Sequence, residues 1–264
     1  MNSFSYDGRH SSEFDLVVAG FKVSDPTLNL KRSTQASTMN KYRSKVNVYG
    51  INYDSVLTIE FQMMRDVCKY QSQEELKFSR TELRKITSWL TSPTSPRIFH
   101  MFSEEPEYDY FGLFTNVEID DDFILNFTFE CTTPYALSQE QTFTIEQEDT
   151  INNLSDELEG YVYPVITITP TIYGDHSITI KNVSDDNRAI TLNNMKLGEV
   201  VTMDCQKLTI KNSYGSLLSF DELDIEGLNY IYWPRLIAGE NQIQVSNGAI
   251  LEFKFRYPVK VGGY

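Results

Sequence analysis

Residues 123–131 of this 264-residue chain separate into two alternating sets of positions. The apolar side chains at the odd positions, from Phe123 to Cys131, fall on one face of an extended chain, which is typical of a half-buried strand. The odd positions of residues 111–119 share a face in the same way. Three aspartates at 120–122 lie between the two segments and predict a turn. We therefore expect a β-hairpin here.

A helical period of hydrophobic residues is found in one segment, which precedes this hairpin. Ser72 followed by Glu75 fits a capping box, and Pro93 disfavours continuation of a helix. These signals predict one amphipathic helix over residues 73–91, with its apolar stripe covering a sheet. The stripe consists of Leu76, Leu83, Ile86 and Leu90, with Trp89 at its edge.

Strands and one polar segment are predicted before the helix. Apolar stretches at residues 14–21 and 46–49 and an alternating segment at 56–61 favour strands. Residues 25–42 show little hydrophobic periodicity. Two interpretations stay open for them, a loop or an arm that becomes ordered only against a neighbouring molecule.

The pattern changes after residue 135, and we place a domain boundary near residue 137. Residues 139–159 are polar and strongly acidic, and the remainder consists of short apolar segments between turn residues. Such spacing predicts an antiparallel β-sandwich or jelly roll over residues 138–264. The predicted strands are 165–169, 177–182, 189–192, 199–204, 207–212, 242–245 and 250–257.

The formal net charge of −14 argues against nucleic acid or an anionic membrane as a partner, because such a surface repels phosphate. No run approaches 18 apolar residues, so no membrane-spanning helix is expected. Cys68, Cys131 and Cys205 are too scattered to suggest a disulfide framework, and free thiols fit assembly in a reducing cytoplasm.

No catalytic or metal-binding pattern is found. His10, His100 and His176 lack a second ligand at metal-site spacing, and we expect them to be structural or solvent-facing. Neither a nucleophile elbow nor a phosphate-binding glycine loop occurs. We predict no enzyme activity, metal or cofactor, although a β-sandwich glycosidase with two carboxylates about 5 to 10 Å apart stays open.

Tyr230, Tyr232 and Trp233 form an aromatic cluster in the second half. Exposed aromatic rings stack on sugars, so the cluster is a candidate sugar contact. We favour core packing or a protein interface, because large aromatics dominate both.

The order of motifs along the chain resembles distal tail proteins of long-tailed bacteriophages that infect Gram-positive hosts. The resemblance covers nearly the whole chain through many loose matches. They are residues 4–8, 11–14, 86–90, 95–99, 125–136, 163–168, 198–205, 233–236 and 239–243.

This resemblance implies a mainly β chain with one helix, in which an N-terminal domain of residues 1–137 closes into a homohexameric ring, possibly in stacked rings. It implies a galectin-like C-terminal domain similar to a carbohydrate-binding module. The implied role is a structural hub in the virion that joins the tail tube to the tail-associated lysin or fibre and to receptor-binding proteins.

Two functions of different classes follow. The leading hypothesis is a hub whose function lies in interfaces, with the polar arm and the strand after it as intersubunit surface. The alternative is a module that attaches the virion to host cell-wall polysaccharide. The candidate intersubunit residues are Lys31, Arg32, Tyr42 and Arg43.

Overall fold

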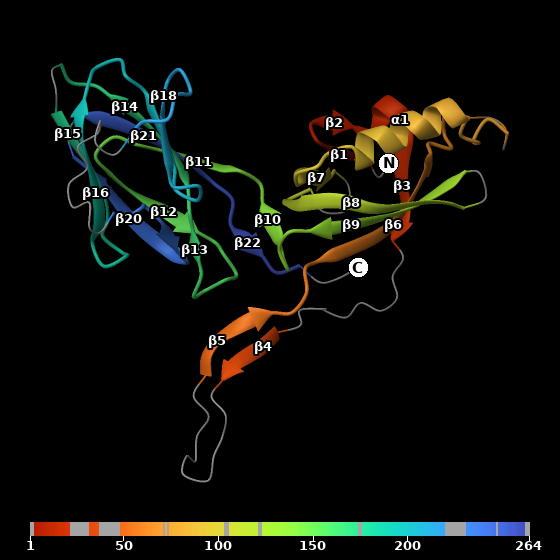
Figure 1. Cartoon of the computed structure of the whole chain (residues 1–264), viewed down its shortest axis with the longest axis horizontal. Helices are drawn as coiled ribbons and strands as arrows, with labels where there is room; N and C mark the ends of the chain where they lie inside the picture. Colours follow the sequence, from red (N-terminus) through yellow and green to blue (C-terminus); the bar gives the residue numbers. More distant parts are fainter. Residues whose placement is uncertain are drawn as a thin grey trace, which may run out of the picture. The chain divides into compact units, whose positions relative to one another are not determined.

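The computed structural model describes residues 3–21, 32–36, 48–70, 72, 74–102, 106–120, 123–173, 176–219, 231–246 and 248–261. The chain divides into two compact units (Figure 1). Unit 1 is Met1–Leu137 with Val259–Tyr264, and unit 2 is Ser138–Pro258. The first division lies between Leu137 and Ser138. The C-terminal tail does not belong to the second unit as expected, because Val259 and Val261 pack on the core of unit 1.

Unit 1 is built on a nine-stranded sheet with the path order β2-β1-β7-β8-β9-β6-β3, to which β10 and β22 attach. The helix α1 (Arg80–Thr91) lies over this sheet, and its buried residues Ile86, Trp89 and Leu90 join an aromatic core (Figure 1). The strands are β1 Phe4–Tyr6, β2 Arg9–His10, β3 Leu16–Phe21, β6 Thr58–Arg65, β7 Arg97–Met101, β8 Tyr108–Asp120, β9 Ile124–Cys131, β10 Ala136–Ser138 and β22 Pro258–Val259; a 3-10 helix, η1, spans Ser11–Phe14.

The predicted start of the helix at residue 73 is wrong, because α1 begins at Arg80. The capping box that forms is Ser79 with Glu82: Ser79 Oγ accepts from the Glu82 N–H, and Glu82 Oε2 accepts from the Ser79 N–H at 2.8 Å. Ser72 Oγ still accepts from the Glu75 N–H at 3.4 Å, but only within a turn. Tertiary contact decides between the two boxes, since Glu82 also forms an ion pair with Arg65 of β6 at 2.7 Å.

The predicted hairpin is present as β8 and β9, but the odd positions of the first strand do not share one face, because Val117 packs towards the core and Phe111 does not. Phe111 and Ile119 are exposed, whereas Tyr110 and Phe114 are buried. The register shifts between Phe114 and Asn116, so a bulge reverses which side chains face the core along β8. The face predicted for β9, from Leu125 to Cys131, is buried as expected.

The polar arm is partly a strand. Its residues 32–36 form β4 (Arg32–Ala36), which pairs antiparallel with β5 (Val48–Tyr53) in a separate two-stranded sheet (Figure 1). The loop interpretation is therefore wrong for this segment. Residues 33–36 are exposed, as are Tyr49 and Ile51 on the partner strand.

Unit 2 is a β-sandwich. A five-stranded sheet in the order β11-β21-β14-β17-β18 and a four-stranded sheet in the order β12-β20-β15-β16 enclose one aliphatic core. All seven strands expected from the sequence are present. The strands are β11 Gln141–Ile145, β12 Glu148–Asn153, β14 Val165–Pro170, β15 His176–Asn182, β16 Arg188–Met195, β17 Val201–Asp204, β18 Thr209–Asn212, β20 Gly239–Val245 and β21 Ala249–Phe255, with a short pair β13 Tyr161–Val162 and β19 Leu236–Ile237.

The architecture confirms the prediction of a mainly β chain with one α-helix over the described residues. Strand β12 was not predicted, because it lies in the acidic stretch where few apolar residues mark it. Its inward residues are Ile151 and Asn153, both buried, and Asn153 is held by hydrogen bonds instead of apolar contacts.

Candidate interaction site

The aromatic residues predicted as a contact surface on unit 2 differ in their exposure to solvent. Tyr232 is 44% exposed, whereas Trp233 is half-buried and packs against the core of the sandwich. Tyr230 lies outside the described residues. Trp233 therefore packs on the core, which is one of the two interpretations favoured from the sequence. Tyr232 is the more exposed of the two described residues.

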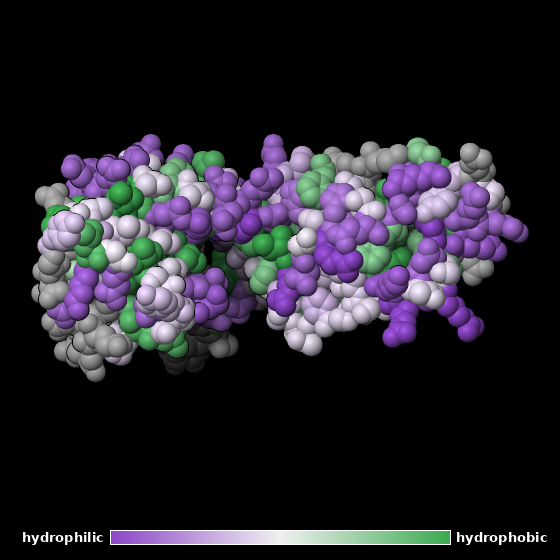
Figure 2. Space-filling model, turned by 90° about the horizontal axis from the view of Figure 1, so that it is seen from above, coloured by the Kyte–Doolittle hydropathy of each residue, from purple (hydrophilic) through white to green (hydrophobic). Residues whose placement is uncertain are grey.

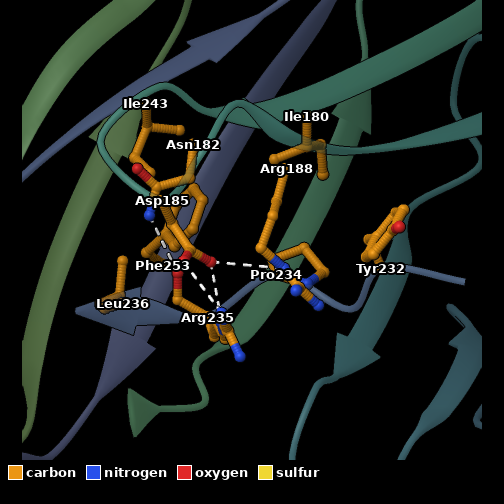
Figure 3. Close-up of a pocket in the computed structure, with 10 residues that line it drawn as sticks. All are labelled: Ile180, Asn182, Asp185, Arg188, Tyr232, Pro234, Arg235, Leu236, Ile243 and Phe253. Atoms are coloured by element: carbon orange, nitrogen blue, oxygen red, sulfur yellow. Dashed lines mark hydrogen bonds and ion pairs between the residues drawn. The ribbon is translucent and has the colours of Figure 1, made fainter. Parts of the chain in front are cut away.

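Tyr232 belongs to a cluster of aromatic rings and arginines around one buried carboxylate (Figure 3). Asp185 accepts two hydrogen bonds from Arg235, at 2.7 Å from Nε and 3.0 Å from Nη2. Arg188 Nε lies 3.3 Å from the same carboxylate, too poorly aligned for a hydrogen bond. The Arg188 guanidinium sits 4.6 Å from the centre of the Tyr232 ring. Two cations thus surround one anion, and the cluster keeps an excess positive charge.

A second stack lies beside the first. The Arg235 guanidinium is 3.5 Å from the centre of the Tyr161 ring. The pKa of Arg235 is raised above its usual value, mainly by its hydrogen bonds to Asp185, so this side chain stays charged. Tyr161, Tyr163 and Tyr232 are each between 41% and 45% exposed. Half-exposed tyrosines pinned by arginines are typical of protein interfaces, where rigid aromatic anchors contribute most of the binding energy.

A buried network of asparagines fixes the backbone that carries this cluster. Asn182 Nδ2 donates to the Arg235 carbonyl at 3.0 Å and to Asn241 Oδ1 at 2.9 Å. Asn241 in turn accepts from the Ile237 N–H at 2.9 Å and donates to the Ile237 carbonyl at 2.8 Å. Asn153 donates to that same carbonyl at 3.0 Å. The segment after Trp233 is therefore held by side chains from three different strands.

The pocket within the cluster is nearly filled by its own side chains (Figure 3). It leaves room for about one water molecule. A sugar ring cannot enter it, so any contact must be made on the outward faces of the tyrosines.

Sequence reasoning missed most of this site. Asp185 and Arg188 are three residues apart in a predicted turn, a spacing that could have suggested their pairing. No local signal links Asp185 to Arg235, or Arg235 to Tyr161, because those pairs meet only through the sandwich.

The predicted intersubunit residues are only partly covered by the structure. Lys31, Tyr42 and Arg43 lie outside the described residues, and Arg32 begins β4 with its side chain also outside them. Their role stays a prediction.

The two histidines with described side chains form local contacts. His10 Nδ1 accepts from the Ser12 N–H at 3.1 Å and caps η1. His100 Nδ1 lies 2.8 Å from Asp109 Oδ1. The side chain of His176 is outside the described set. Across the described segments, no three His, Cys, Asp or Glu side chains gather as metal ligands, and no helix there could cross a membrane.

The chain is similar in fold to solved phage proteins. The SPP1 Dit protein, described as a paradigm of the hub adsorption apparatus in phages infecting Gram-positive hosts, matches 97% of this chain and 99% of its own, with a TM-score of 0.68 and 12% identity. A chain of the phage P2 baseplate in its activated conformation with Ca matches 98% and 99%, with a TM-score of 0.57 and 12% identity. No curated protein matches the sequence.

Family models identify the chain directly. Residues 1–134 match the model of a phage tail protein N-terminal domain, and residues 127–255 match that of a phage tail C-terminal domain. Together the two matches span both units, and the protein therefore belongs to this family of phage tail proteins.

Proposed function

We propose that this protein is the distal tail hub of a long-tailed phage: a structural adaptor that joins the tail tube to the tip. The observation that carries the proposal is the family match over both units, supported by a fold shared along 97% of the chain with SPP1 Dit. The adaptor works through its interfaces and catalyses no reaction.

In this proposal six copies form a ring, alone or stacked on a second ring. One face of the ring binds the tail-tube protein. The other binds the tail-associated lysin or tail fibre and, with it, receptor-binding proteins. The exposed β4–β5 ribbon supports an intersubunit role for the arm, because paired strands with exposed Tyr49 and Ile51 offer apolar contact area.

The Tyr–Arg cluster of unit 2 serves in this proposal as a contact for a protein of the tail tip. Tyr161, Tyr163 and Tyr232 supply anchors, and the arginine stacks on Tyr161 and Tyr232 reduce the side-chain entropy lost on binding. In this proposal, unit 2 corresponds to the galectin-like C-terminal domain.

Carbohydrate binding is the alternative function of unit 2, and the exposed tyrosine faces are the observation in its favour. The nearly filled pocket and the inward packing of Trp233 favour the protein contact instead. A glycan array probed with the purified chain and with Tyr232→Ala separates the two, since only the sugar function predicts binding that this substitution removes.

Immunogold electron microscopy of intact tails tests the hub. An antibody against this chain is expected to label the distal end of the tube, one cluster per tail. Labelling along the whole tube, or at the end that joins the head, would overturn the proposal.

A further inference from the structure

The outer face of α1 carries three exposed cations, Arg80, Arg84 and Lys85. Within the described part of the chain none of them forms an ion pair or hydrogen bond through its side chain. The helix itself disfavours Arg80 and Arg84. Arg80 occupies the first helical position, where the positive end of the helix dipole repels a cation. Arg84 follows one turn later, where like charges repel each other. The presence of these two arginines is therefore not explained by the electrostatics of the helix itself.

Three described carboxylates near this face are already engaged. Glu82 pairs with Arg65 at 2.7 Å and Asp7 pairs with Arg97 at 2.8 Å. Glu13 pairs with Arg9 at 2.7 Å. The face therefore keeps a positive charge on a chain whose formal net charge is −14.

This cationic face borders an open groove that is rigidly built. Arg84 and Lys85 line it together with Phe14 and Trp89. The Trp89 ring stacks on Phe14 with centroids 4.6 Å apart, and Trp89 Nε1 donates to the Tyr6 carbonyl at 3.1 Å. Figure 2 views the molecule from the side on which α1 lies, and hydrophilic residues predominate over the helix. The cations are thus presented on a fixed support.

The same chain carries a surface of opposite charge. Residues 139–159 contain seven carboxylates and neither lysine nor arginine. Glu146, Glu148 and Asp149 of this stretch are exposed at the turn from β11 into β12. Among the side chains that the structure describes, none pairs these three carboxylates with a cation.

We propose that the outer face of α1 binds the acidic β11–β12 turn of a second copy of this chain. Three cations meet three carboxylates, and the contact joins two different surfaces of identical molecules. Such heterologous contacts close into rings when the rotation permits. The inference rests on the proposed hub function and names one of its intersubunit contacts.

DNA and an anionic membrane fit the cationic face of α1 less well than a second copy of the chain. Three cations are fewer than the phosphate contacts of a typical DNA-binding protein, about 6 to 10. They are also fewer than the cluster of about 4 to 8 that binds an anionic membrane surface. A protein surface with three spaced carboxylates carries as many charges as the three cations on α1.

Charge reversal on the full chain tests the contact, with mass measured by light scattering after size exclusion at low salt. Each of the variants R84E/K85E and E146K/D149K is expected to raise the dissociation constant of self-association at least about tenfold, since like charges then face each other. An equimolar mixture is expected to reassemble, because copies of the two kinds alternate with opposite charges at every contact. The matched control K196E/K211E reverses two exposed lysines of unit 2 and is expected to leave the mass unchanged.

Reassembly of the mixture also excludes a contact within one chain, which mixing cannot restore. The proposal is overturned if the wild-type chain does not self-associate, if R84E/K85E assembles like wild type, or if the mixture stays dissociated. Each of these outcomes leaves the hub function to be judged separately by labelling of the tail tip, which does not depend on this contact.

Discussion

The two units of this protein build their cores from different kinds of side chain. Among the described residues of unit 1, ten of the 21 that form the buried core are aromatic and two are isoleucine. Among those described in unit 2, nine of the 21 core residues are isoleucine and two are aromatic. Unit 1 packs one helix onto a single sheet, so large rings fill the uneven space between them. Unit 2 packs two sheets face to face, where β-branched side chains of uniform size interdigitate.

The packing geometry follows from this difference. In unit 1, Phe129 lies 5.0 Å from Phe99 and 5.1 Å from Phe114 between ring centroids. Tyr6 meets Phe114 edge-on at 4.9 Å. Aromatic pairs at these distances contribute beyond their buried area. Unit 2 instead adds specificity through its buried asparagines, whose hydrogen bonds fix the segment that carries the Tyr–Arg cluster.

The largest expected effect is that of Phe129→Ala. Phe129 is fully buried among other rings, so its truncation leaves a cavity and is expected to lower the free energy of unfolding of unit 1 by about 3 to 5 kcal/mol. Each unit contains one tryptophan, so urea unfolding followed by Trp89 fluorescence in a Trp233→Phe background reports unit 1 alone. A loss below about 1 kcal/mol would show that the rings are loosely packed.

Asn241→Ala tests the polar network of unit 2. The substitution leaves the Ile237 N–H and the Asn182 amide without their partner in a buried site. We expect a loss of about 1 to 3 kcal/mol in unit 2, monitored by Trp233 in a Trp89→Phe background. The exposed neighbour Asn152→Ala is the control and is expected to have little effect. Equal losses for the two variants would contradict a structural role for the network.

Both cores hold one buried thiol, which allows their opening to be compared at alkaline pH. Burial raises the pKa of Cys131 in unit 1 to about 12 and raises that of Cys205 in unit 2 as well. A thiol whose pKa is higher in the folded chain than in the unfolded chain stabilises the fold. This contribution is fully present below the ordinary thiol pKa of about 8.5 and is lost as the pH rises above it. At one pH unit above that value, ionisation of each thiol in the unfolded chain is therefore expected to lower the stability of its unit by about 1.4 kcal/mol.

The measurement is alkylation of each cysteine by mass spectrometry as the pH rises. Exposed Cys68 reacts first and serves as the internal reference. Cys131 and Cys205 are expected to react only as their units open. If either buried thiol reacted as fast as Cys68 at neutral pH, the core around it would not exclude solvent.

The smallest effect is expected for Tyr6→Phe. The hydroxyl of Tyr6 is buried, has no hydrogen-bond partner among the described residues, and its pKa is raised to about 12, mainly by burial. Removal of an unpaired buried hydroxyl is expected to change the stability of unit 1 by less than about 1 kcal/mol and in the stabilising direction. A clear destabilisation in thermal unfolding would show that this hydroxyl makes a hydrogen bond in solution.

Local patterns in the sequence determined much of this protein. Alternation over residues 123–131 is sufficient to identify β9 and its buried face, and short alternating segments identify seven strands of unit 2. The polar stretch after residue 137 marks the first division between the units. These features depend on each residue and its near neighbours, which is why a single sequence contains them.

Long-range contacts decided the rest. Two capping boxes compete for the start of α1, and the ion pair from Glu82 to Arg65 favours the second. A bulge in β8 changes which side chains face the core, and the alternation of apolar and polar residues in the sequence does not predict it. The Tyr–Arg cluster joins residues up to 74 positions apart, Tyr161 with Arg235. Each of these outcomes depends on partners that only the folded chain brings together, because their energies come from contacts between distant residues and not from local propensity.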